Sequence, residues 1–390
     1  MDSALSGIVI LDLSTDLAGS YACMLLGDMG AQVVKVELAD CPDWRGCLPF
    51  HLWNRGKKSI CLDLDRDGAR GVLGGLVAKA DVLVESFLPA EARDRGLDYD
   101  SLCPLNPRLL YCALPPFGEE GPSSDKPADD GVVAAFSGIM GDQNGKGKPP
   151  EFITVPASSY GAAFLAAYAI SSALYVRELE GVGQKIEVPL LNGALAMQAH
   201  GFVDGPGLER IRETHSDPQG SLPAYRLYEC SDGRWIFIAC GNEAFWTKLC
   251  TTLGLEEYLS DPRFEEAPWN FQEEDQVRVI AAIGEVIKRR PHDHWLELFD
   301  REDVPCASAG SRDEFVEDPQ VLHNRMMVEL KDPMLGDTRQ MGIPVSLPLT
   351  LGGIMGAAPR RGEHGNEILS ELGYSQSELG RLKSNGAIIC

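Results

Sequence analysis

Short apolar runs alternate with helical patterns along the first part of the chain. The run 8–13 is apolar and rich in β-branched residues, and 18–30 follows with apolar side chains at helical spacing. A second apolar run covers 32–37. A strand, a helix and a strand in this order make a βαβ unit, and its crossover connection builds a parallel sheet. The pattern therefore predicts an α/β domain of Rossmann-like character.

The same alternation continues beyond this first unit. Further strands are predicted at 59–62, 81–84, 109–112 and 185–190, and further helices at 69–79, 157–179 and 192–200. The glycines Gly181 and Gly183 follow a helix and not a strand, so they are typical of a helix end and not of a phosphate-binding loop. The sheet is therefore predicted without a dinucleotide fingerprint.

The second half of the chain has a different pattern. The segment 201–224 is rich in Gly, Pro and charge and is predicted as a linker. A hairpin is predicted at 225–239, with its turn at Asp232 and Gly233. The predicted helices of this half are 243–253, 276–289, 291–299, 365–372 and one starting at Ser375, whose partner Glu378 completes a capping box.

These elements predict four parts along the chain. A large α/β domain begins with 1–200, the linker covers 201–224, a small α+β domain covers 225–317, and 318–390 returns to the large domain. A hydrophobic share of 44% and a charged share of 24% fit such a globular chain.

Charge and composition exclude several function classes. A formal net charge of -23 disfavours nucleic acid and anionic membrane surfaces as partners. The uncharged stretch 152–176 is long enough for a membrane span, but its many polar and small residues favour a buried helix. The start of the chain has no signal-type pattern, so a cytoplasmic protein is expected. Eleven cysteines at irregular spacing, without a C-x-x-C pair, indicate neither a disulfide framework nor a metal site.

A series of short motifs runs along the chain in a fixed order. The motifs are 11–13 with 18–19, 25–37, 54–64, 80–89, 106–109, 117–122, 177–184, 261–264 and 371–375. In this order and spacing, the set resembles the family III CoA-transferases from end to end. The resemblance implies an interlocked dimer in which each chain threads through its partner. It also implies a large domain built from both chain ends, with the small domain as an insertion.

The resemblance also implies a covalent reaction. Enzymes of this family use an aspartate at the start of a long helix to attack a CoA thioester, which gives an anhydride and then an aspartyl-CoA thioester. Counted back from the turn 181–184, this aspartate falls at Ser158 or Ser159; counted from the glycine inside the helix, it falls at Ala157. The stretch 154–160 holds no carboxylate, so the catalytic aspartate is missing. A serine there is typical of a helix cap.

Other expected site positions are also changed. The resemblance implies that the CoA-binding positions of the family correspond to Leu62, Ser86, Phe87, Arg93, Arg95 and Lys126 in this chain. Ser86 stands where the family has an asparagine, and the expected arginine is replaced by Asp94, which Arg93 and Arg95 flank. The histidine of the family's racemase branch falls at Asp129, which argues against an α-proton racemase.

These changes give three hypotheses for the function. The leading one is a non-catalytic subunit of a heteromeric CoA-transferase, paired with a paralogous catalytic subunit that keeps the aspartate. This arrangement is similar to the two-subunit benzylsuccinate CoA-transferases, with succinyl-CoA as donor. Its small-molecule partners would be an acyl-CoA, which is a substrate, and a carboxylic acid, and no cofactor is expected. The alternatives are a stand-alone acyl-CoA enzyme with changed chemistry and a non-enzymatic CoA-binding or regulatory module.

Overall fold

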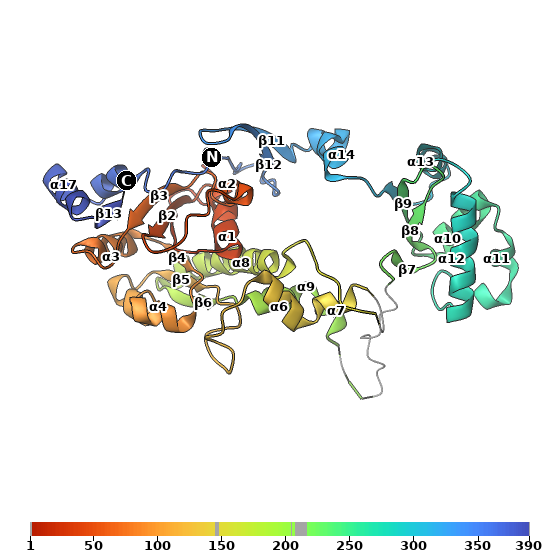
Figure 1. The fold of residues 1–390 in the computed structure, drawn as a ribbon, viewed down its shortest axis with the longest axis horizontal. Coiled ribbons are helices and arrows are strands. Elements are labelled where there is room, and N and C mark those ends of the chain that lie inside the picture. Colours follow the sequence, from red (N-terminus) through yellow and green to blue (C-terminus); the bar gives the residue numbers. More distant parts are fainter. Residues whose placement is uncertain (1, 145–147, 204, 207–216, 390) are drawn as a thin grey trace. The chain divides into compact units, whose positions relative to one another are not determined.

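The computed structural model describes residues 2–144, 148–203, 205–206 and 217–389 (Figure 1). Backbone contacts divide the chain into two units. The larger unit combines Met1–Ile139, Ile153–Phe202 and Leu322–Cys390, and the smaller one combines Met140–Phe152 and Val203–Val321. The larger unit is thus built from both ends of the chain. Much of the predicted linker, at 204 and 207–216, lies outside the described residues. The interlocked dimer stays a prediction.

The larger unit is built on a seven-stranded sheet in the order β13-β3-β2-β1-β4-β5-β6. The strands β1 to β6 pair in parallel, and β13 pairs antiparallel with β3 at one edge. The predicted α/β class and its parallel sheet are therefore confirmed. The strands are β1 (Val9–Asp12), β2 (Gln32–Leu38), β3 (Lys58–Leu62), β4 (Val82–Glu85), β5 (Leu110–Ala113), β6 (Gln184–Glu187) and β13 (Ile388–Ile389).

Alternation along the strands gives this sheet two apolar faces. Ile10 and Val82 contribute to a core on one face, and their neighbours Leu11 and Leu83 contribute to a core on the other. Helices α1 and α8 cover the first face, and α3, α16 and α17 cover the second. These helices are α1 (Leu17–Asp28), α8 (Ala157–Glu180), α3 (Ala69–Lys79), α16 (Gly365–Glu371) and α17 (Gln376–Ser384).

Two glycines allow α8 to cross the helix α9 (Leu190–Met197) at very short range. A Cβ atom on Gly161 would lie 2.6 Å from the carbonyl oxygen of Gly193. A Cβ atom on Gly193 would in turn collide with the carbonyl oxygen of Ser158. Only glycine fits at either position, because the two backbones are in contact there. The crossing therefore fixes the place of the first turn of α8.

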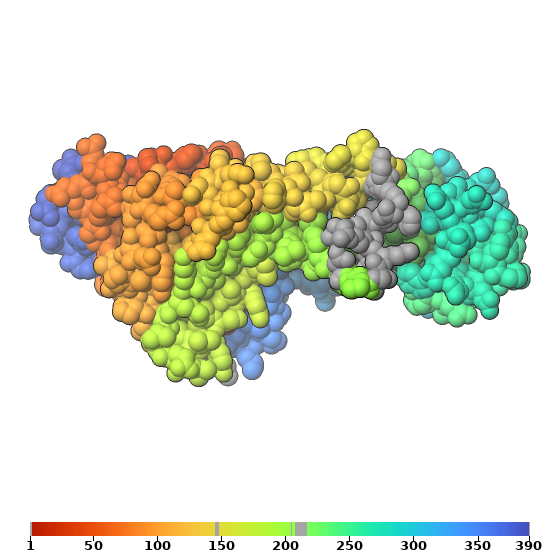
Figure 2. Space-filling view, turned by 90° about the horizontal axis from the view of Figure 1, so that it is seen from below, coloured from red at the N-terminus to blue at the C-terminus, as the bar shows by residue number. Residues whose placement is uncertain are grey.

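Helix α8 is long and apolar enough to cross a bilayer by length and composition alone. One of its faces is instead part of the core on the sheet, where Ala162, Ala166 and Ile170 are completely buried. Its other face is exposed, with Tyr168 and Tyr175 about 70% accessible, and contributes to the yellow-green surface in Figure 2. The structure therefore agrees with the prediction of a buried core helix for this stretch, although only one face is covered.

The smaller unit holds an antiparallel sheet in the order β10-β9-β8-β7. The predicted hairpin is confirmed, because β8 and β9 pair directly and Gly233 in their turn has a φ of 78°. Three helices pack on this sheet around Tyr228, Trp246 and Trp295. The elements are β7 (Gly220–Leu222), β8 (Tyr225–Glu229), β9 (Trp235–Ala239), β10 (Cys306–Ser308), α10 (Glu243–Leu253), α12 (Glu273–Ile287) and α13 (His292–Arg301).

Shorter elements complete the chain. In order along the sequence they are α2 (Leu48–Trp53), α4 (Pro89–Arg95), α5 (Tyr99–Leu102), η1 (Cys103–Leu105), α6 (Asp130–Ser137), α7 (Ile139–Asp142), η2 (Ala199–Gly201), α11 (Glu257–Ser260), η3 (Pro262–Phe264), α14 (Arg312–Glu317), α15 (Pro319–His323), β11 (Met327–Asp332) and β12 (Gly336–Met341). The last two form an antiparallel hairpin.

Candidate active site

A pocket of about 550 Å³ opens in the larger unit, at the carboxyl ends of β1 and β2. Its lining comes from the β1–α1 turn, the end of β2, helix α2, and the first residues of α6 and α8. The strand order reverses between β1 and β4, because β2 and β3 lie to one side of β1 while β5 and β6 continue on the other. Open α/β sheets bind ligands at such a reversal, outside the carboxyl ends of the strands. The position therefore marks the pocket as the candidate site.

A buried ion cluster lies beneath this pocket. Asp12, at the end of β1, is completely buried and accepts hydrogen bonds from the Nζ atoms of Lys35 at 3.1 Å and Lys57 at 2.7 Å. Burial by itself would raise the pKa of Asp12, but the charges of both lysines hold that pKa below its usual range. Asp12 carries one negative charge against the two lysines, so the three side chains keep a formal net charge of +1, and Lys35 also lines the pocket.

Asp16 lies four residues further on and lines the pocket itself. It is the N-cap of α1, and its Oδ1 accepts a hydrogen bond from the Gly19 N–H at 3.1 Å. Burial raises the pKa of Asp16 to about 6, although Gly19, the charge of Lys35 and a hydrogen bond from Ser86 act in the opposite direction. Asp16 is therefore a desolvated carboxylate that is still ionised at neutral pH.

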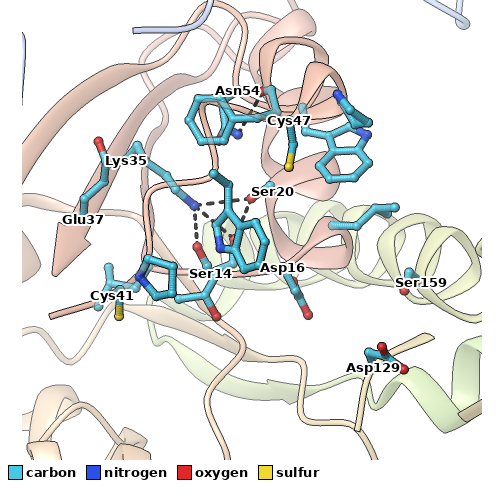
Figure 3. A pocket seen from close by; sticks show the side chains of 18 of the residues that line it. Ser14, Asp16, Ser20, Lys35, Glu37, Cys41, Cys47, Asn54, Asp129 and Ser159 are labelled. Atoms are coloured by element: carbon cyan, nitrogen blue, oxygen red, sulfur yellow. Dashed lines mark hydrogen bonds between the residues drawn. The ribbon is translucent and has the colours of Figure 1, made fainter. Parts of the chain in front are cut away.

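The first turn of α8 brings two serines to the same region. Ser159 lines the pocket, and its backbone N–H donates to the Oδ1 of Asp130 at 2.7 Å. Ser158 is completely buried, and its Oγ has no hydrogen-bond partner among the described residues. Figure 3 shows Ser159 and Asp129 on one side of the pocket, with Asp16 between them and Ser14. The carboxylate that caps the start of α8 thus comes from α6 and not from α8 itself.

The opposite wall of the pocket is apolar. It is formed mainly by Trp44, Phe50 and Trp53, together with prolines and leucines. Arg361 also lines the pocket, but its guanidinium donates to the backbone carbonyl oxygens of residues 38, 39 and 41. Within the described parts of the chain, no group of three His, Cys, Asp or Glu side chains is placed to hold a metal ion. The pocket thus combines carboxylates and the Lys35 ammonium group with an aromatic wall.

The predicted CoA-binding residues are only partly brought together. Ser86, Phe87 and Arg95 line a second pocket of about 390 Å³, which shares Thr15, Cys41, Pro42, Trp44 and Ala128 with the first. Arg95 already pairs with Asp40 at 2.9 Å and with Glu91 at 3.0 Å. The two pockets therefore meet, and three of the six predicted residues line the second one.

The other three predicted residues lie elsewhere. Arg93 is exposed, 3.9 Å from Asp125, and lines a small pocket of about 80 Å³. Lys126 is exposed on the loop before α6, while Leu62 is fully buried in the core. Their part in binding CoA stays a prediction.

Sequence reasoning did not single out Asp16 or the aromatic wall. An aspartate directly before a helix is typical of an N-cap, and Asp16 does cap α1. The available signal was the position of Asp16 in the turn that follows a buried strand, at the carboxyl edge of a parallel sheet. Asp129 was considered only as the position of a missing histidine, whereas both Asp129 and Asp130 line the pocket.

Comparisons with known proteins agree with this architecture. The model of CoA-transferase family III matches residues 5–365. The acetyl-CoA:oxalate CoA-transferase of Acetobacter aceti is 31% identical over 342 residues, which cover 83% of this chain and 85% of that protein. The human succinyl-CoA:glutarate CoA-transferase is 28% identical over 398 residues, covering 98% of this chain and 90% of that protein. A CaiB/BaiF family protein from Brucella suis has a crystal structure that superposes with a TM-score of 0.81 at 28% identity, covering 95% and 100% of the two chains.

Proposed function

The chain belongs to CoA-transferase family III, and on that premise we propose that it transfers CoA from an acyl-CoA donor, such as succinyl-CoA, to a carboxylic acid acceptor. The observation that carries the proposal is the pocket of about 550 Å³ at the start of α8, which is open and lined by carboxylates. Carboxylates are the groups that this type of transfer needs, because an acyl group is passed through an anhydride.

The two joined pockets suggest how the substrates would be held. The second pocket, with Ser86, Phe87 and Arg95, would take the arm of CoA that leads to the thioester. The first pocket, with its aromatic wall, would take the acyl group. The thioester would then lie where the pockets meet, close to the β1–α1 turn and the first turn of α8.

The test is a transfer assay with the purified chain alone. Succinyl-CoA is mixed with a panel of carboxylic acids that includes oxalate, glutarate and an aromatic acid, and new CoA thioesters are identified by mass spectrometry. A new thioester that depends on both donor and acid is expected. Hydrolysis to free CoA without a new thioester, or no reaction with any donor, would contradict the proposal.

A second candidate function is favoured by the sequence of α8. Because 154–160 contains no carboxylate, this chain would be the non-catalytic subunit of a heteromer whose paralogous partner supplies the aspartate. Co-purification with such a paralogue, combined with activity only in the pair, would support this second candidate. Activity that survives when the partner's aspartate is replaced by asparagine would exclude it.

A further inference from the structure

Covalent CoA transfer needs an ionised carboxylate that lines the reaction pocket. Helix α8 supplies none, yet four carboxylates line the pocket from other elements, and one of them, Glu37, is already paired with Arg45. The other three are Asp129 and Asp130 at the start of α6 and Asp16 in the β1–α1 turn, of which Figure 3 labels Asp129 and Asp16. The question is which of the three is placed to react.

The two α6 carboxylates cap helices, as Asp16 caps α1, so capping alone does not decide which of the three reacts. Asp130 accepts the Ser159 N–H at 2.7 Å and so completes the start of α8. Asp129 accepts the Val132 N–H at 3.0 Å, caps α6, and is exposed to solvent. A solvated carboxylate is a weak nucleophile, because attack requires it to shed bound water.

Asp16 differs from both in its place and in its surroundings. It is less exposed than Asp129, and its neighbour Thr15 lines both pockets. The Thr15 N–H donates to the Oγ of Ser86 at 3.0 Å, and Ser86, which lines the second pocket, also hydrogen-bonds to Asp16. Asp16 therefore lies where the predicted CoA pocket meets the acyl pocket. Its raised pKa adds to its basicity and hence to its nucleophilicity.

From this placement we propose that Asp16, at the N-terminus of α1, is the nucleophilic carboxylate of CoA transfer in this chain, in place of the aspartate missing from α8. The proposal rests on the proposed function, because it assigns a residue to that reaction. Asp16 would act as a catalytic residue, while Asp130 would act as a positioning residue that holds the first turn of α8.

The reaction balances without any cofactor or redox partner. A carboxylate oxygen of Asp16 attacks the thioester carbonyl carbon of the donor, the C–S bond breaks, and CoA leaves as a thiolate. The thiolate attacks the side-chain carbonyl of Asp16 in the resulting anhydride and releases the donor as a free carboxylate. The acceptor carboxylate then attacks the Asp16–CoA thioester, and the released thiolate attacks the acceptor carbonyl, which frees Asp16.

The first half of this sequence can be trapped without knowing the acceptor. The full chain is mixed with succinyl-CoA or cinnamoyl-CoA alone, treated with borohydride to reduce any aspartyl thioester to an alcohol, and mapped by peptide mass spectrometry. The reduced residue is expected at Asp16. The variant Asp16→Asn keeps a side-chain oxygen that can cap α1, so it should fold but lose CoA transfer by a factor on the order of 1,000 or more.

Two further variants make the outcome decisive. Asp318→Asn is the matched control, because Asp318 accepts the Gln320 N–H at 2.8 Å near a helix start outside the pocket, and it should transfer CoA like the parent chain. Asp130→Asn tests the rival carboxylate and should still yield the adduct on Asp16. An adduct on Asp129, Asp130 or a serine, or full transfer by Asp16→Asn, overturns the assignment while leaving the proposed function in place. A parent chain that transfers no CoA overturns both.

Discussion

Asp12 and Asp16 lie four residues apart, at the two ends of one turn, and their pKa values are shifted in opposite directions although burial raises both. Two lysines pair with Asp12, and the pKa of Asp12 is held below its usual range. Asp16 has only backbone and hydroxyl donors beside it, and burial raises its pKa to about 6. Burial alone therefore does not determine the state of a carboxylate; the availability of a counter-charge does.

The difference also separates structure from chemistry. Asp12 ties β1 to β2 and to the residues before β3 through Lys35 and Lys57, so it holds the sheet edge together beneath the pocket. Both lysines hydrogen-bond to Asp12, whereas Asp16 accepts its hydrogen bonds from Gly19 and Ser86, so the charge of Asp16 is less well compensated. Asp12 thus stabilises the fold, whereas the buried charge of Asp16 lowers the stability, as is common for reactive groups in active sites.

The largest expected effect follows from breaking the ion cluster. Asp12→Asn leaves two buried ammonium groups with no opposing charge, so the free energy of unfolding should fall by about 3–5 kcal/mol. Chemical denaturation at pH 7.5 followed by circular dichroism measures this loss. The control is Asp63→Asn, which removes an exposed ion pair with Arg66 and should change the unfolding free energy by less than about 1 kcal/mol. Equal losses in both variants would contradict the role given to Asp12.

Replacing the other aspartate should have the opposite sign. The pKa of Asp16 is about 6 in the folded chain and about 3.9 when unfolded, so between these values the folded chain binds more protons and stability falls as pH rises. Asp16→Asn removes this penalty while it keeps the cap. We expect a gain of about 1–2 kcal/mol at pH 7.5, after allowance for partial exposure, and little gain at pH 4. A gain that is the same at both pH values would show that Asp16 titrates normally.

The smallest effect extends the comparison to the start of α8. The hydroxyl of Ser158 is buried without a hydrogen-bond partner among the described residues. The cost of removing this hydroxyl from water is therefore not compensated, whereas the corresponding cost for Asp16 is compensated in part. Ser158→Ala should raise the free energy of unfolding by up to about 1 kcal/mol. Ser171→Ala is the control on the same helix, because the Ser171 hydroxyl is exposed and donates to the Ala167 carbonyl at 2.8 Å. A loss of stability in Ser158→Ala would show that the hydroxyl has a partner after all.

Local pattern predicted much of the fold. The β-branched runs around Ile10 and Val33 predicted parallel strands, and the turn at Gly233 predicted the hairpin; both are confirmed. Strand order and the meeting of the two pockets could not be predicted, because they depend on contacts between distant segments. The absence of a carboxylate around Ser159 was visible in the sequence. The raised pKa of Asp16 was not, since it depends mainly on burial, which is set by the packing of distant segments.

The contact between Gly161 and Gly193 has a consequence for how this site could change over time. It holds the backbone of the first turn of α8 in place whatever the side chain at position 159. A change of side chain at that position therefore leaves this frame intact, and a single substitution such as Ser159→Asp would place a carboxylate at the start of α8. The residues that set the shape of the pocket and those that carry its reactive groups are thus different, so either set can change without the other.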